Sequence, residues 1–150
     1  MQLRSHAFQH QGKIPVRFTC DGADVSPPLV WSGAPKEARS FALVCSDPDA
    51  PNGTWYHWAM FDISKGVSEL VEHRAAGSSS PPQAINDFRK RGYSGPCPPR
   101  GHGQHHYHFT LFAVNVTKLD VLSAADCREV EAAARSHAIA TAELVGTYER

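Results

Sequence analysis

Apolar and polar residues alternate along much of this chain, and the alternation predicts a mainly β protein. Between residues 106 and 113, Tyr107, Phe109, Leu111 and Ala113 occupy every second position. Successive side chains of a strand point to opposite faces, so this period of two is typical of a strand. Six segments have strand character, namely residues 14–19, 29–32, 40–45, 55–63, 106–116 and 139–148.

One of these segments, residues 55–63, carries apolar side chains on both of its faces. Ala59 and Phe61 alternate with Trp58 and Met60. A strand with this pattern is expected to be buried on both sides. Turn dipeptides such as Asn52-Gly53 separate the predicted strands.

A single helix is predicted, close to the C-terminal end. Ser123 is followed three residues later by Asp126, which indicates a capping box. Cys127, Val130 and Ala134 then recur at helical spacing up to about His137.

Residues 64–104 form a long connection with weak periodicity, and connections of this length inside a domain are typically functional loops. Residues 78–82, Ser-Ser-Ser-Pro-Pro, are predicted to be its least ordered part. Residues 86–88 are expected to return the chain to the body of the protein through a short strand.

Composition adds few constraints, but it narrows the class of protein. The 150 residues predict one domain, residues 1–150. Fifteen basic residues balance fifteen acidic ones, so no overall field favours nucleic acid or an anionic membrane. No secretory signal or membrane span is recognised. The four cysteines lie far apart without CxxC spacing, which predicts free thiols and a cytoplasmic protein.

Two loops rich in proline and glycine carry the candidate chemistry, residues 46–51 and residues 95–104, and each precedes a predicted strand. Proline fixes the backbone and glycine allows close approach to a ligand, which favours a rigid polar pocket. The polar residues that these loops and the strands after them contribute are Asp47, Asp49, His57, His105 and Tyr107.

Two imidazoles and a phenol supply hydrogen-bond donors that suit a phosphate monoester or a carboxylate. Gly101 and Gly103 are expected to let backbone N–H groups add to these donors. Anion binding should then weaken as pH rises, since the imidazolium forms of His57 and His105 attract phosphate.

Other interpretations remain open at this level. Each residue alone fits a structural role, for example Asp47 and Asp49 as turn residues. His102, His105 and His106 could hold zinc, although neighbouring positions on a strand point to opposite faces. Cys97 with His105 and Asp47 could form a hydrolase, but Cys97 lies between two prolines and not at a helix N-terminus.

Taken together, the motifs resemble the phosphatidylethanolamine-binding protein family, also called Raf kinase inhibitor-like proteins, and most closely its short bacterial and archaeal branch. The matching segments cover nearly the whole chain in order. They are Ile14-Pro15, Thr19-Cys20-Asp21-Gly22, Ser26-Pro27-Pro28-Leu29, Trp31-Ser32-Gly33, Asp47-Pro48-Asp49-Ala50-Pro51, His57-Trp58, Asn86-Asp87-Phe88, Gly92-Tyr93, Gly95-Pro96-Cys97-Pro98-Pro99, His105-His106-Tyr107 and Glu143-Leu144-Val145-Gly146-Thr147-Tyr148.

The resemblance implies a flattened β-sandwich with a small pocket at one end for phosphate-type anions, such as a phosphorylated small molecule, a lipid head group or a phosphoprotein. The family's pocket pattern falls on Asp47, Asp49, Pro51, His57, Pro98, His105 and Tyr107. Non-enzymatic binding without a cofactor or metal is therefore the expected function. An inhibitor that docks on a kinase or a protease is the alternative, and a cysteine hydrolase is third.

The resemblance also implies where this chain departs from the family. Asp62 stands where asparagine is more usual, and the gating C-terminal helix of the animal members is missing. Bacterial members are often dimeric, so self-association is a further expectation.

Overall fold

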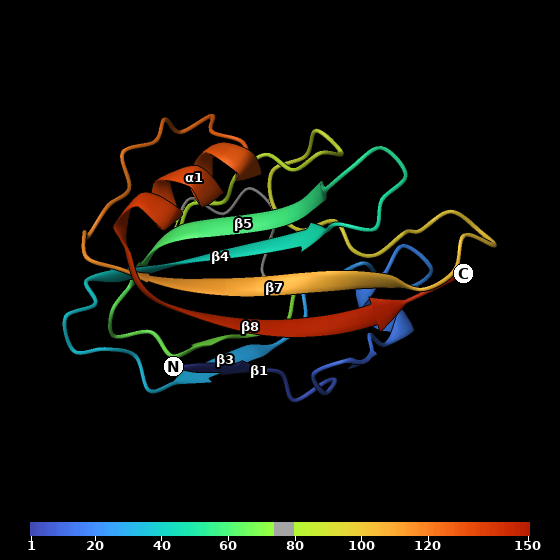
Figure 1. The fold of residues 1–150 in the computed structure, drawn as a ribbon, viewed down its shortest axis with the longest axis horizontal. Helices are drawn as coiled ribbons and strands as arrows, with labels where there is room; N and C mark the ends of the chain where they lie inside the picture. The colour runs from blue at the N-terminus through green and yellow to red at the C-terminus, as the bar shows by residue number, and fades with distance from the viewer. Residues whose placement is uncertain (74–79) are drawn as a thin grey trace.

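Two β-sheets and one helix make up the computed structural model of the protein, which describes residues 1–73 and 80–150 (Figure 1). The larger sheet has the strand order β2-β8-β7-β4-β5 and the smaller sheet the order β1-β3-β6. The strands of the larger sheet are β2 (Gly12–Lys13), β4 (Ser40–Asp47), β5 (Trp55–Ser64), β7 (His105–Val114) and β8 (Ala138–Tyr148). Those of the smaller sheet are β1 (Gln2–Arg4), β3 (Leu29–Ser32) and β6 (Glu69–Leu70). Neighbouring strands are antiparallel, except for the parallel pair β2 and β8.

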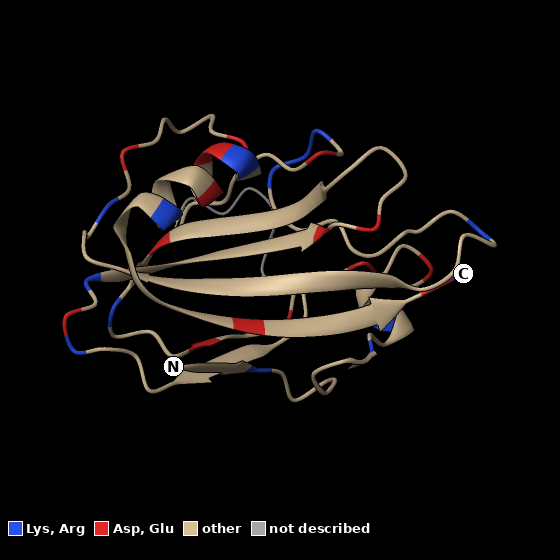
Figure 2. Ribbon diagram, in the orientation of Figure 1, with Lys and Arg blue, Asp and Glu red and all other residues tan. Residues whose placement is uncertain are grey.

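The larger sheet is buried on both faces because a hydrophobic core lies on each. Tyr107, Phe109, Leu111 and Ala113 of β7 face the core shared with the smaller sheet. Phe112 of the same strand belongs to a second core, which α1 (Cys127–His137) covers. The predicted β-sandwich and the two-sided burial of residues 55–63 are both confirmed. Lys, Arg, Asp and Glu gather mainly in the loops, on α1 and at strand ends, with one acidic residue midway along β8 (Figure 2).

The helix forms where it was predicted, but its cap differs. Asp126, and not Ser123, is the N-cap residue, since its carboxylate accepts a hydrogen bond from the Glu129 N–H at 2.9 Å. Cys127, Val130 and Ala134 are buried against the sheet, as their helical spacing predicted. A carboxylate at the N-cap accepts a hydrogen bond from an N–H group that the first turn leaves without a partner. Its negative charge also interacts favourably with the positive end of the helix dipole.

Two other local predictions are wrong. Residues 14–19 were predicted as a strand, but the structure has a short 3₁₀ helix there, η1 (Val16–Phe18), which follows directly after Pro15. Residues 86–88 return the chain through turns, and strand-like pairing beside them is limited to isolated bridges of Ile85 with Arg91 and with Asp126. Ser78 and Ser79 of the predicted disordered segment lie outside the described residues.

The cysteines contradict the expectation of four free thiols. Cys20 and Cys97 form a disulfide across 77 positions of sequence, with their Cα atoms 5.4 Å apart. Cys45 and Cys127 are free and buried. Spacing in the sequence did not reveal the pair, because the fold alone brings the two loops together. None of the described helices is long and apolar enough to span a membrane.

Candidate functional site

A pocket of about 230 Å³ opens at the end of the sandwich where β4 finishes and β5 and β7 begin. It includes six of the seven predicted ligand residues, and the exception is Asp49. Its lining residues are Asp47, Ala50, Pro51, Asn52, Trp55, His57, Phe88, Cys97, Pro98, Pro99, His105 and Tyr107. Residues 47 and 107 are thus brought together by the antiparallel pairing of β4 with β7.

A β-bulge accounts for the position of His57. Cys45 of β4 pairs with Trp58 and Ser46 pairs with Tyr56, so His57 is the extra residue between them. Under strict alternation His57 would share a face with Ala59 and turn toward the helix. Bulges re-aim side chains in this way. The His57 ring instead lies edge-on against Tyr107, with centroids 5.3 Å apart.

The environment of His57 favours its neutral form, contrary to the expectation of an imidazolium. Burial lowers the pKa of His57, and this outweighs the opposing effects of the Ser94 carbonyl and of Asp47. Nδ1 lies 2.6 Å from the Ser94 carbonyl oxygen, which can only accept, so Nδ1 carries the proton. In the neutral ring Nε2 is therefore an acceptor, and His57 does not supply the second cationic donor.

His105 is held between two partners at the pocket floor. Its Nδ1 lies 2.7 Å from Oδ2 of Asp47, and both side chains are buried. Its Nε2 lies 2.6 Å from Nδ1 of His102. The other carboxylate oxygen of Asp47 accepts the N–H of Asp49 at 2.8 Å. Both oxygens of this buried acid are thus engaged by protein donors, which offsets the repulsion that a bare carboxylate would exert on an anion.

Tyr107 presents a buried hydroxyl without a hydrogen-bond partner. Among the described residues, only Tyr107 and Trp31 have a buried side-chain polar atom in this state, and only Tyr107 lines the pocket. Burial raises the pKa of Tyr107, so the phenol stays protonated and can donate. Unpaired buried polar groups are costly and uncommon, which makes this hydroxyl a strong indication of a missing partner.

Asp49 does not line the pocket and instead contacts His106 at the start of β7. Its carboxylate accepts the backbone N–H of His106 at 2.8 Å and lies 2.7 Å from Nδ1 of the same residue. These contacts lower the pKa of Asp49, although burial opposes them. Asp49 therefore joins the 46–51 loop to the start of β7, and the geometry gives it a positioning role.

The pocket wall of residues 94–99 is fastened to residues 18–24 at several points. The Cys20–Cys97 disulfide is one, and the Gly95 N–H donates to the Asp24 carboxylate at 2.8 Å. Arg150 holds the same wall from the C-terminal end of the chain, since its Nε donates to the Pro98 carbonyl at 2.9 Å. These contacts hold the wall in place before any ligand arrives.

Several residues of the site escaped the sequence analysis. Ser94 orients His57, and the buried Asn86 side chain donates to Ser94 Oγ at 3.0 Å and to the Gly92 carbonyl at 2.9 Å. In the sequence, only the Asn86-Asp87-Phe88 motif indicated these hydrogen bonds of Asn86 and Ser94. The Gly101 N–H, expected to serve a ligand, instead donates to the Arg150 carbonyl at 3.0 Å.

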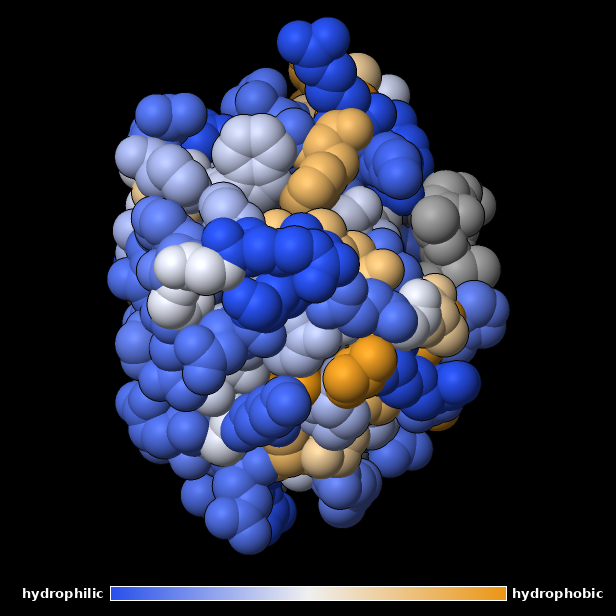
Figure 3. All heavy atoms as spheres, turned by 90° about the vertical axis from the view of Figure 1, so that its right-hand side faces the viewer, coloured by the Kyte–Doolittle hydropathy of each residue, from blue (hydrophilic) through white to orange (hydrophobic). Residues whose placement is uncertain are grey.

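The rim of the pocket is apolar and aromatic. Trp55 and Phe88 are 38% and 37% exposed and contact each other edge-on, with ring centroids 5.4 Å apart. Figure 3 views this end of the molecule and shows small apolar patches in a mostly hydrophilic surface. A polar floor beneath an apolar rim suits a ligand with an anionic group and an apolar portion.

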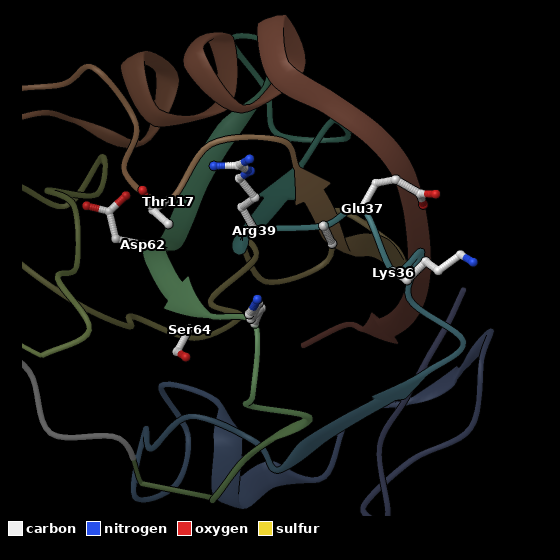
Figure 4. Close-up of a pocket in the computed structure, with 8 residues that line it drawn as sticks. Lys36, Glu37, Arg39, Asp62, Ser64 and Thr117 are labelled. Carbon is white, nitrogen blue, oxygen red and sulfur yellow. The ribbon is translucent and has the colours of Figure 1, made fainter.

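A larger depression, of about 800 Å³, lies at the opposite end of the β4–β5 hairpin. Figure 4 shows charged side chains of both signs around it, with Lys36 and Glu37 on one side and Asp62 on the other. Asp62 is tied to the backbone, since it accepts the Leu119 N–H at 2.8 Å. The side chains that line this depression are mostly exposed, so we do not regard the depression as the primary site.

Within the described part of the chain, no three His, Cys, Asp or Glu side chains gather as a metal site would require. His102 and His105, the natural pair from the sequence, direct one nitrogen each toward the other. Cys97 is bonded to Cys20 and so does not offer a thiolate beside His105.

Fold and pocket together define a β-sandwich with a small pocket at one end, and comparison with known proteins shows its family. The family model for phosphatidylethanolamine-binding protein matches residues 4–149. The chain belongs to this family.

Two curated relatives align with the whole of this chain. The UPF0098 protein of Methanothermobacter thermautotrophicus is 44% identical, with 100% of this chain and 99% of that protein covered. The UPF0098 protein of Aquifex aeolicus is 41% identical, with 100% and 89% covered.

Solved structures agree with the fold. The phosphatidylethanolamine-binding protein homolog CT736 of Chlamydia trachomatis superposes with a TM-score of 0.88 at 38% identity, covering 99% of this chain and 97% of that chain. Escherichia coli YbcL, described as a member of the mammalian family, gives a TM-score of 0.92 at 32% identity, covering 99% and 98%.

Proposed function

We propose that the protein is a non-enzymatic binding module that takes a phosphate-type anion into the pocket at the end of β4, β5 and β7. The observation that carries this proposal is the Tyr107 hydroxyl, which is buried, protonated and without an acceptor. An anionic oxygen at the pocket floor supplies that acceptor. The ligand class is a phosphorylated small molecule, a lipid head group or a phosphorylated side chain.

The surroundings of the hydroxyl support an anion over a cation. Asp47 is the acidic residue of the lining, and both of its oxygens already accept protein hydrogen bonds. His105 faces the same side of β7 as Tyr107, and its second nitrogen, Nε2, donates when the ring takes up a proton. Binding is favoured over hydrolysis because the sulfur of Cys97 is held in a disulfide.

Tyr107→Phe tests the proposal, because a binding role predicts weaker phosphate affinity without a loss of stability, whereas a structural role predicts a loss of stability. The change removes one hydroxyl and keeps the ring. A hydrogen bond to an anion is worth about 1.5–3 kcal/mol, so we expect phosphate affinity to fall about tenfold or more. Stability without ligand should stay the same or rise, because the lost group had no partner.

Calorimetric titration with inorganic phosphate and with phosphoethanolamine measures the affinity, and thermal melts without ligand measure the stability. Tyr56→Phe is the matched control. The Tyr56 hydroxyl lies outside the pocket and donates a hydrogen bond of 2.7 Å to Glu131. That control should lose a little stability and keep its affinity. Wild-type affinity in Tyr107→Phe would contradict the proposal.

Docking on a kinase or a protease is a second candidate, and the half-exposed Trp55 and Phe88 favour it. Exposed aromatic pairs beside a pocket are suited to contacts with a protein partner. Inhibition of a kinase or protease panel by the wild type, lost in Trp55→Ala, would support this function. Absence of inhibition across the panel would count against it.

A further inference from the structure

The second nitrogen of His105 is already occupied by a side chain of the same protein. Nε2 of His105 lies 2.6 Å from Nδ1 of His102, so one hydrogen is shared between the two nitrogens. Asp47 fixes the proton of His105 on Nδ1, because a carboxylate oxygen only accepts. In neutral His105, Nε2 therefore accepts a hydrogen bond from His102. An anion cannot use this nitrogen while His102 remains in place.

The loop that carries His102 is built to let the imidazole leave. Gly101 and Gly103 flank it with φ values of 75° and 93°, and a Cβ at either glycine would meet nothing within 4 Å. His102 itself is exposed, whereas His105 is 2% exposed. The base of the loop stays anchored, since the His102 N–H donates to the Pro99 carbonyl at 3.1 Å. Rotation of the side chain therefore costs no buried contact in the core.

From this arrangement we infer that His102 is an internal competitor, which holds the anion position on His105 and must be displaced when a ligand binds. This inference rests on the proposed function and adds a residue that sets the affinity of the site. When the anion binds, His105 takes up one proton from solvent, so that Nε2 donates to the anion while Nδ1 still donates to Asp47. The imidazole of His102 then faces solvent.

The competitor also selects among ligands. A ligand replaces His102 only when its own hydrogen bond to His105 is stronger than the one that the neutral His102 imidazole makes. Charge-assisted hydrogen bonds are about twice as strong as neutral ones, so anionic oxygens satisfy this condition and neutral hydroxyl groups do not. His102 thus disfavours uncharged polar molecules that would otherwise fit the pocket.

His102→Ala removes the competitor, and we expect it to bind inorganic phosphate about three- to tenfold more tightly than the wild type, as the loss of one neutral hydrogen bond implies. His108→Ala is the control. His108 follows Tyr107 on β7, but its ring pairs with Glu143 at 3.1 Å outside the pocket, so affinity should not change. Calorimetric titration compares the three proteins under one condition.

Imidazole nitrogen NMR gives a second measurement that does not depend on affinity. Without ligand, the wild type should show His102 and His105 joined through a shared hydrogen, and phosphate should shift the His102 signals to those of a solvent-exposed ring. Weaker or unchanged binding in His102→Ala would overturn the inference, as would a shared hydrogen that survives saturation with phosphate. If no variant and no wild-type protein binds phosphate or phosphoethanolamine, the proposed function fails, and the inference fails with it.

Discussion

Removal of the Cys20–Cys97 disulfide should cost this protein a large part of its stability. The bond closes a loop across 77 positions of sequence. In the chain-entropy treatment, a closed loop of this length destabilises the unfolded state by about 4.5 kcal/mol. The measured loss should be about 2–5 kcal/mol, because unfolded chains retain some structure.

The double variant Cys20→Ser/Cys97→Ser is the appropriate change, since it leaves no unpaired thiol in the pocket wall. Hydrogen bonds across the same junction remain, such as the Cys20 N–H with the Pro96 carbonyl at 3.0 Å. With a total stability of about 5–15 kcal/mol for a domain of this kind, the variant should still fold. Its wall should be less rigid, so phosphate affinity should fall modestly.

Urea unfolding of the oxidised wild type and of the double variant, each with and without a thiol reductant, provides the measurement. Reductant should lower the midpoint of the wild type toward that of the variant and leave the variant unchanged. Equal midpoints for the oxidised wild type and the double variant would refute the reasoning. An equal response of both proteins to the reductant would do so as well.

Two further predictions concern the pocket floor and its wall. Burial lowers the pKa of His57 from its ordinary value of 6.5, so the unfolded state binds more protons below that pH and stability should fall as the pH drops through about 6.5. His57→Asn keeps an amide donor for Ser94 and should remove this part of the pH dependence of the unfolding free energy, which is at most about 1.4 kcal/mol per pH unit. Denaturant melts of both proteins across pH measure it. An unchanged pH dependence in the variant would show that the assignment to His57 is wrong. Gly95→Ala should cost about 1–3 kcal/mol or more, because an added Cβ would run into the Phe18 carbonyl and lie 2.6 Å from the Asp24 carboxylate. Gly66→Ala is its control, with only Ser64 Oγ near, at 3.9 Å, and equal urea midpoints for the two variants would count against the close approach.

Periodicity was a sound guide to the long elements of this fold. The alternation from Tyr107 to Ala113 identified β7, and the spacing of Cys127, Val130 and Ala134 identified α1. Both patterns record which face of an element is buried, and burial of apolar surface drives folding. Short elements carry too few residues for this signal, so β1 and β6 went unpredicted and residues 14–19 were assigned wrongly.

The candidate site divides in the same way. The sequence by itself determined which polar side chains stand at strand ends beside proline and glycine, and so it assembled Asp47, His57, His105 and Tyr107 as one group. Local chemistry suffices for this, because proline and glycine restrict or free the backbone wherever they occur.

Only the tertiary structure decided how these side chains are used. A bulge turns His57 toward Tyr107, burial keeps that histidine neutral, and a loop returns His102 to His105. The Cys20–Cys97 bond was equally hidden, since 77 positions of sequence separate its ends. Register, burial and long-range contact depend on how whole strands pair and which loops meet, and no short stretch of sequence contains that information.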